Sequence, residues 1–306
     1  MKSLLRLLSS VYRRHPLSTS QQEAQRQPFF IIGSGRSGTT LLRSLLYRHP
    51  RVHIPPETDF ALPQAIRIFQ NYQWLPWPVL VHLILAYFQF NDAFRYWELN
   101  LGNVKDELIN LPASERSLWT IIDRIYRAHG TKEGKKDIWW GDKTPLITFG
   151  LKELHQLYPD AKYIEMVRDP RAVVNSYLRF GRYDKLKDAC GRWQQSIEAV
   201  EGFRTKIGSQ QVMQIRYEDL VEKPEAYLKE LCSFLQLNFD PGMLVHEAQS
   251  MGDTILQHHA NVHQPITVQH REKWKTELSS EQIIQIETQL GERLRQQGYT
   301  NSKPTE

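Results

Sequence analysis

The chain has 306 residues, 41% of them hydrophobic and 24% charged, which excludes a disordered chain and is enough to bury a sizeable core. Its formal net charge of +5 is too small to indicate a nucleic-acid partner. Its two cysteines, Cys190 and Cys232, exclude a disulfide framework, so we expect both to be buried on helices and the protein to be cytoplasmic.

Residues 1–27 precede the first predicted strand and form a basic tail. Up to residue 22 this segment contains Lys and Arg but no acidic residue. Arg6 interrupts the apolar run that a secretory signal requires. We predict a flexible tail, and the pattern leaves open an organelle transit peptide or a helix that contacts a membrane surface.

An uncharged stretch from Trp74 to Phe90 is rich in Leu, Val, Trp and Phe. Only Val79 to Phe88 is mostly apolar, and a bilayer span needs roughly 20 such residues. We therefore predict a buried or lid-like helix inside a helical insertion over residues 59–131, and no membrane span. Four tryptophans of this insertion either fill its core, as we expect for most, or stack on an acceptor ring: Trp74, Trp77, Trp97 and Trp119.

Strands that alternate with helices predict an α/β fold with a parallel sheet covered on both faces. The predicted strands are Phe29–Ile32, Ile138–Trp140, Tyr163–Val167 and Val212–Ile215. The helices that accompany them include residues 38–49, a helix that starts at Asp169 and Pro170, Tyr227–Leu235, and a C-terminal helix opened by a capping box of Ser279 and Gln282. We expect a single domain over residues 28–300, followed by a short tail at 301–306.

The strongest local signal is the glycine-rich loop that follows the first strand, Gly33-Ser-Gly-Arg36-Ser-Gly-Thr-Thr40. A helix that begins within such a loop points backbone N–H groups and the positive end of its dipole at an anion. A Walker A motif requires Lys after Gly38, and this chain has Thr39 there. The loop therefore argues against an enzyme that hydrolyses ATP or GTP with magnesium.

The second strand end repeats the pattern in Arg168-Asp-Pro-Arg171 with Ser176 further along the helix. An arginine at a strand tip and a serine on the next helix would bind one phosphate by charge and by hydroxyl. Alone, this motif is weak, because surface Arg–Asp pairs are common. Together with the first loop it predicts a site for two phosphate groups.

With these two motifs, the chain resembles the sulfotransferases. The loop from Gly33 to Thr40 looks like their 5′-phosphosulfate loop, and Arg168 with Ser176 looks like their 3′-phosphate motif. Three more stretches extend the likeness over about Pro28 to Tyr299: Trp140-Gly-Asp-Lys143-Thr-Pro145, Arg216-Tyr217-Glu-Asp-Leu-Val221, and Arg271-Glu-Lys273-Trp274. The similarity is strongest to the branch of bacterial sulfotransferases and tyrosylprotein sulfotransferases.

The resemblance implies a P-loop-type parallel sheet flanked by helices, with a helical lid. It implies the donor 3′-phosphoadenosine 5′-phosphosulfate, no metal, and in-line transfer of the sulfuryl group to a hydroxyl or amine. It places Glu57 as the general base and Lys143 as the cation that stabilises the transferring group. The nucleotide-binding positions that it implies are Arg36, Ser37, Gly38, Thr39, Thr40, Leu41, Arg168, Ser176, Tyr217 and Lys273.

This sequence departs from the tyrosylprotein sulfotransferases at two positions. The first concerns the acceptor, and the second concerns the catalytic site. Tyrosylprotein enzymes carry an arginine two residues after the base, where this chain has Asp59, so we expect a carbohydrate, lipid or small-molecule acceptor. A serine that assists transfer in those enzymes aligns with His258, which either donates a hydrogen bond, acts as an acid or base, or is a solvated loop residue.

The sequence also allows other roles for Glu57 and Lys143 and other functions for the protein. Glu57 alternatively caps a helix with Thr58, and Lys143 alternatively pairs with Asp142. The competing function classes are a P-loop kinase or nucleotide hydrolase and a non-enzymatic anion-binding protein. The sequence leaves the oligomeric state undetermined.

Overall fold

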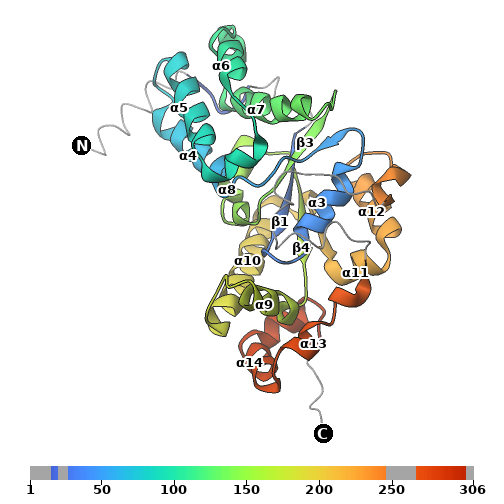
Figure 1. The fold of residues 1–306 in the computed structure, drawn as a ribbon. Coiled ribbons are helices and arrows are strands. Elements are labelled where there is room, and N and C mark those ends of the chain that lie inside the picture. The colour runs from blue at the N-terminus through green and yellow to red at the C-terminus, as the bar shows by residue number, and fades with distance from the viewer. Residues whose placement is uncertain (1–14, 20–26, 246–266, 301–306) are drawn as a thin grey trace, which may run out of the picture. The chain divides into compact units, whose positions relative to one another are not determined.

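The computed structural model describes residues 15–19, 27–245 and 267–300. A five-stranded sheet has the order β2-β3-β1-β4-β5 (Figure 1). Its strands are β1 (Phe29–Gly33), β2 (Val52–His53), β3 (Trp139–Lys143), β4 (Lys162–Val167) and β5 (Val212–Arg216). The pairs β2–β3 and β4–β5 are parallel, and Val167 pairs with Arg216 at the carboxyl ends of β4 and β5. The prediction of an α/β fold with a parallel sheet is confirmed.

Two differences from the predicted strands have physical reasons. The two-residue strand β2 is too short to show any hydrophobic period. The third strand extends to Lys143 instead of ending at Trp140, although Gly141, Asp142 and Lys143 are not strand-like residues. All three are buried, and a Cβ on Gly141 would lie 2.5 Å from the ring of Phe29, so the tight packing of β3 requires glycine there.

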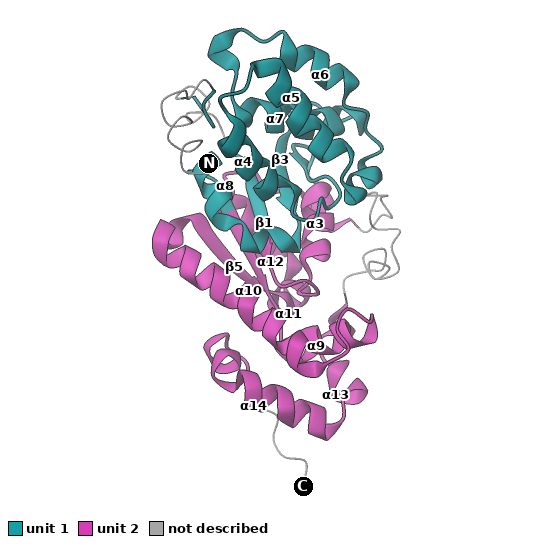
Figure 2. Cartoon of the chain, turned by 90° about the vertical axis from the view of Figure 1, so that its left-hand side faces the viewer, with its two compact units in different colours: residues 1–30, 49–162, 251–253 teal, residues 31–48, 163–250, 254–306 magenta. Residues whose placement is uncertain are grey.

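The chain divides into two compact units, coloured separately in Figure 2. Among the described residues, unit 1 comprises 15–19, 27–30 and 49–162, and unit 2 comprises 31–48, 163–245 and 267–300. The extent of the single domain expected over residues 28–300 stays a prediction.

Unit 1 holds the insertion, which is helical as predicted. Its helices are α4 (Ala61–Tyr72), α5 (Trp77–Gln89), α6 (Gly102–Ile109) and α7 (Leu118–Lys132), followed by α8 (Leu151–Leu157) after β3. Helix α5 packs against α4 and α6, and Trp77, Trp97 and Trp119 are buried, whereas Trp74 is exposed. The expectation that most of these tryptophans are core residues is therefore confirmed. No helix in the described residues is long and apolar enough to cross a membrane.

Unit 2 holds the glycine-rich loop and the second strand end. Helix α10 packs against α9 and α14, and the three helices share a core with Trp193, Trp274 and Tyr299. Ser279 and Gln282 form the predicted capping box at the start of α14, and both cysteines are buried on helices as expected. The helices of this unit are α3 (Thr39–Tyr47), α9 (Pro170–Arg179), α10 (Leu186–Ile207), α11 (Tyr217–Glu222), α12 (Pro224–Phe234), α13 (Trp274–Glu277) and α14 (Ser280–Gln296).

Candidate active site

The glycine-rich loop connects β1 directly to α3. Gly33 has φ +127°, and a Cβ there would lie 2.4 Å from the carbonyl oxygen of Met166, so only glycine fits. Gly38 has φ +91° and lies against the ring of Tyr217, where a Cβ would come 2.4 Å from Cδ2. The loop places the first turn of α3, with Thr39, Thr40 and Leu41, at its end.

Ser37 gives this loop an unused hydrogen-bonding group. Its side chain is fully buried, and its Oγ has no hydrogen-bond partner among the described residues. No side chain caps the first turn of α3. Since buried polar groups are almost always paired, a buried hydroxyl beside an uncapped helix N-terminus fits an anion such as a phosphate.

The second predicted anion motif lies beside this loop. Arg36 Nε donates a hydrogen bond of 3.0 Å to Ser176 Oγ, and Arg168 Nη1 donates one of 3.3 Å to the carbonyl of Arg36. The guanidinium of Arg168 also lies 4.1 Å from the centre of the Tyr217 ring. Four of the residues assigned from the resemblance are thus brought together within unit 2.

Lys273 lies at the edge of the same cluster. It is exposed and immediately precedes α13, while His270 accepts a 2.6 Å hydrogen bond from Arg168 Nη2 at its carbonyl. The pKa of His270 is lowered, first by burial and then by the positive charges of Lys273 and Arg168. The surroundings of Arg168 therefore have a positive potential, which favours an anionic ligand.

Unit 1 contains the two residues expected to carry the chemistry. Lys143 is the last residue of β3 and its side chain has no exposed surface, while Glu57 is 27% exposed. Lys143 Nζ donates a hydrogen bond to Glu57 Oε1, which makes a partly buried ion pair. The neighbouring Asp142 accepts a 2.5 Å hydrogen bond from the hydroxyl of Tyr126.

Side chains hold the residues on both sides of Glu57 through hydrogen bonds with the backbone. Trp97 Nε1 donates to the carbonyl of Pro56 at 3.0 Å, and the N–H of Thr58 donates to Thr144 Oγ1 at 3.3 Å. Helix α4 begins at Ala61 with no side-chain cap, so Glu57 does not cap it. No local sequence pattern indicated that Trp97 and Thr144 hold this segment, although Thr144 directly follows Lys143 in the matched stretch.

The chemistry of these groups suits anion transfer. A lysine ammonium carries three N–H donors and a positive charge that can stabilise an anionic group, and a carboxylate such as Glu57 can take a proton. No group of three His, Cys, Asp or Glu side chains suited to a metal ion occurs in the described part of the chain. His258 lies outside the described residues.

Comparisons with known proteins agree with this geometry. A model of the sulfotransferase family matches residues 28–241. Protein-tyrosine sulfotransferase A of Caenorhabditis elegans is 26% identical over 292 residues, which cover 90% of this chain and 69% of that protein. Protein-tyrosine sulfotransferase 1 of Danio rerio is 27% identical over 224 residues, covering 71% of this chain and 55% of that protein.

A solved structure shares the fold. The sulfotransferase domain from the curacin biosynthetic pathway has a TM-score of 0.59 and 26% sequence identity, and the match covers 87% of this chain and 99% of that one. The family match spans well over half of the chain, and it includes the loop, both expected catalytic residues and the second anion motif. The chain belongs to the sulfotransferase family.

Proposed function

We propose that this sulfotransferase moves the sulfuryl group of 3′-phosphoadenosine 5′-phosphosulfate to a hydroxyl or amine by in-line displacement. The observation that carries the donor assignment is a cluster in which Arg36 bonds to Ser176 and Arg168 bonds to the carbonyl of Arg36. The cluster lies beside a loop that holds the buried hydroxyl of Ser37. This donor carries phosphate on both the 3′ and the 5′ oxygen of its ribose. The two phosphates match two anion-binding elements, the glycine-rich loop and the motif of Arg168 and Ser176. It has no γ-phosphate, so the missing Walker lysine is no obstacle.

In the proposed reaction the donor's phosphosulfate is held by the loop and by the first turn of α3. Arg168 and Ser176 bind the 3′-phosphate, and Tyr217 and Lys273 contact the nucleotide. The bond between sulfur and the donor's phosphate oxygen breaks as sulfur bonds to the acceptor atom, and the acceptor proton passes to Glu57. Lys143 stabilises the negative charge that develops on the transferring group and the leaving oxygen.

The 3′-phosphate assignment predicts a selective loss of binding. Calorimetric titration should show that 3′,5′-adenosine bisphosphate binds and Mg·ATP does not. Arg168→Ala should weaken bisphosphate binding by about 10- to 100-fold, the loss expected for hydrogen bonds to a charged group. The variant should leave the affinity for 5′-AMP nearly unchanged, because 5′-AMP has no 3′-phosphate.

Arg293→Ala is the matched control, because Arg293 lies on α14 in the same unit and pairs with Glu198 and Glu201 instead. A preference for Mg·ATP would contradict the proposal in favour of a P-loop kinase or hydrolase. Anion binding that survives loss of Arg36 would favour a non-enzymatic binder.

The acceptor we propose is a carbohydrate, lipid or small molecule. Asp59 is exposed two residues after Glu57. The pKa of Tyr87 is raised, first by burial and then by the charge of Asp59, so this negative charge lies near the α5 tyrosine. Such a charge opposes an acidic acceptor. A tyrosyl peptide is the second candidate, because the relatives named above are protein-tyrosine sulfotransferases.

A panel of acceptors tested with radiolabelled donor separates these classes. It should include sugars, lipid alcohols, phenols, and tyrosyl peptides with acidic and with neutral flanks. We expect no transfer to the acidic peptide, and a gain of transfer to it in Asp59→Arg, because that change replaces repulsion by attraction. Efficient labelling of the acidic peptide by the unaltered protein would contradict the proposed acceptor class and leave the donor assignment intact.

A further inference from the structure

The backbone that follows Arg168 is held by hydrogen bonds to two other parts of unit 2. Trp193 Nε1, on α10, donates to the carbonyl of Arg168 at 3.2 Å. The N–H of the next residue, Asp169, donates to Glu218 Oε1 at 3.1 Å. The peptide group that follows the arginine expected to bind the 3′-phosphate is therefore held at both its carbonyl and its N–H.

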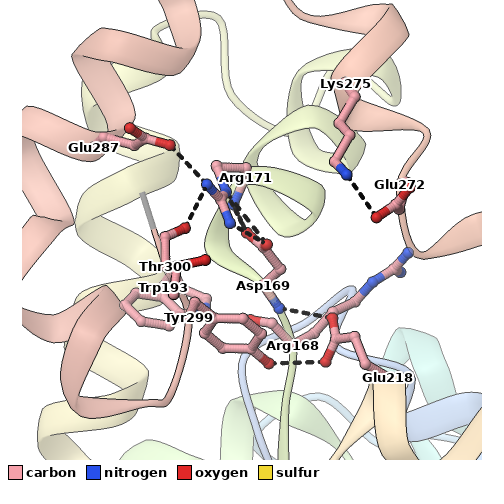
Figure 3. Close-up of polar contacts among 10 residues, drawn as sticks. All are labelled: Arg168, Asp169, Arg171, Trp193, Glu218, Glu272, Lys275, Glu287, Tyr299 and Thr300. Atoms are coloured by element: carbon pink, nitrogen blue, oxygen red, sulfur yellow. Dashed lines mark hydrogen bonds and ion pairs between the residues drawn. The ribbon is translucent and has the colours of Figure 1, made fainter. Parts of the chain in front are cut away.

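Glu218 is almost fully buried near the start of α11, directly after Tyr217. Its second oxygen, Oε2, accepts a 2.8 Å hydrogen bond from the hydroxyl of Tyr299, as Figure 3 shows. The pKa of Tyr299 is raised, first by burial and then by the charge of Glu218, so the phenol stays protonated and donates a hydrogen bond to the carboxylate. One buried carboxylate thus joins the end of β4, the start of α11 and the segment after α14.

The segment after α14 is attached at two successive residues. Besides the bond from Tyr299, the carbonyl of Thr300 accepts a 3.0 Å hydrogen bond from Arg171 Nη1. Arg171 in turn contacts both carboxylate oxygens of Asp169 (Figure 3). Tyr299 therefore approaches Glu218 from a fixed position.

These hydrogen bonds also affect the positions of two neighbouring side chains, those of Arg168 and Tyr217. Arg168 precedes Asp169 and Tyr217 precedes Glu218, so the bond between Asp169 and Glu218 links the two backbone segments that carry the predicted nucleotide-binding residues. The guanidinium of Arg168 lies over the ring of Tyr217, at 4.1 Å from its centre. A shift of Glu218 would change the direction of this guanidinium, and a phosphate-binding arginine depends on that direction.

We propose that Glu218 and Tyr299 are positioning residues for donor recognition, which hold Arg168 in the orientation that binds the 3′-phosphate. The inference rests on the proposed function. It assigns a role in donor binding to Tyr299, which lies more than 100 residues beyond Arg168 and outside the matched family segment. A purely structural role would lower stability without any dependence on Arg168.

A double-mutant cycle distinguishes the two roles. Tyr299→Phe removes one hydroxyl and keeps the ring, so the variant should fold. We expect it to weaken bisphosphate binding by about 3- to 10-fold when Arg168 is present, the size of coupling typical of residues in one hydrogen-bonded network. In the Arg168→Ala background the same change should have no further effect. Glu218→Gln, which keeps the shape of the side chain, should behave in the same way.

Tyr227→Phe is the matched control, because Tyr227 pairs with Asp219, the next residue of α11. It should leave bisphosphate affinity unchanged in both backgrounds. Equal losses from Tyr299→Phe with and without Arg168, or no loss in either, would contradict the positioning role while Arg168→Ala still supports the proposed function. Failure of the unaltered protein to bind the bisphosphate would contradict the proposed function, and the positioning role with it.

Discussion

Replacing Lys143 by methionine is expected to lower the rate of sulfuryl transfer by about 10²- to 10³-fold, the cost of removing one preorganised donor to a developing negative charge. Methionine has a similar length and fills the buried position at the end of β3, but it carries no charge. Affinity for 3′,5′-adenosine bisphosphate should stay the same, because that ligand lacks the sulfuryl group. Initial rates with radiolabelled donor and calorimetric titration measure the two quantities separately.

A half-buried lysine of unit 1, Lys135, provides the control. Lys135 Nζ donates a 2.5 Å hydrogen bond to the carbonyl of Val52, and burial lowers the pKa of Lys135 to about 8. Lys135→Met therefore removes a partly buried, hydrogen-bonded ammonium from the same unit and should lower stability without a specific loss of transfer. Equal losses of activity in the two variants, or full turnover in Lys143→Met, would contradict the catalytic role of Lys143.

The parts of the fold that the sequence predicted well are those determined locally. The stretch from Phe29 to Leu42 contains an apolar strand, glycines at two positions of positive φ, and an amphipathic helix, so its sequence alone indicates a strand, a tight loop and a helix. The strand Lys162–Val167 and the helix after Asp169 are of the same kind, and Asp169 caps that helix as its position predicted. Hydrophobic period and capping chemistry suffice for such elements.

The features that the sequence did not predict depend on contacts between residues that are far apart in the chain. Asp142 and Lys143 are buried in β3 although charged residues do not predict a buried strand. Tyr126 donates a hydrogen bond to one oxygen of Asp142, and Glu57 pairs with Lys143 from a position 86 residues away. The resemblance assigned roles to Glu57 and Lys143, but no local pattern indicates that they form an ion pair. Glu218 and Tyr299 were missed for the same reason, because their contact joins segments 81 residues apart.

Glu57→Gln is expected to slow transfer strongly, because an amide of the same shape cannot take the proton of the acceptor. General bases contribute about 10²- to 10⁴-fold to rates, and we expect a loss in that range. The variant should also lose stability, since it leaves the buried ammonium of Lys143 opposite a neutral group. Breaking a fully buried pair costs about 3–5 kcal/mol, and the partial exposure of Glu57 should make the loss smaller.

The double variant Glu57→Gln with Lys143→Met separates these two effects. It contains neither charge, so the midpoint of thermal unfolding should return toward that of the unaltered protein, because no unpaired buried charge is left. Transfer should stay slow, because both the base and the cation are missing. If activity recovered together with stability, the low activity of Glu57→Gln would be a consequence of local unfolding, and the general base would have to be another residue. We expect stability to recover without activity. This result would show that Glu57 and Lys143 stabilise the fold only as an ion pair, and that transfer needs one as the base and the other as the cation.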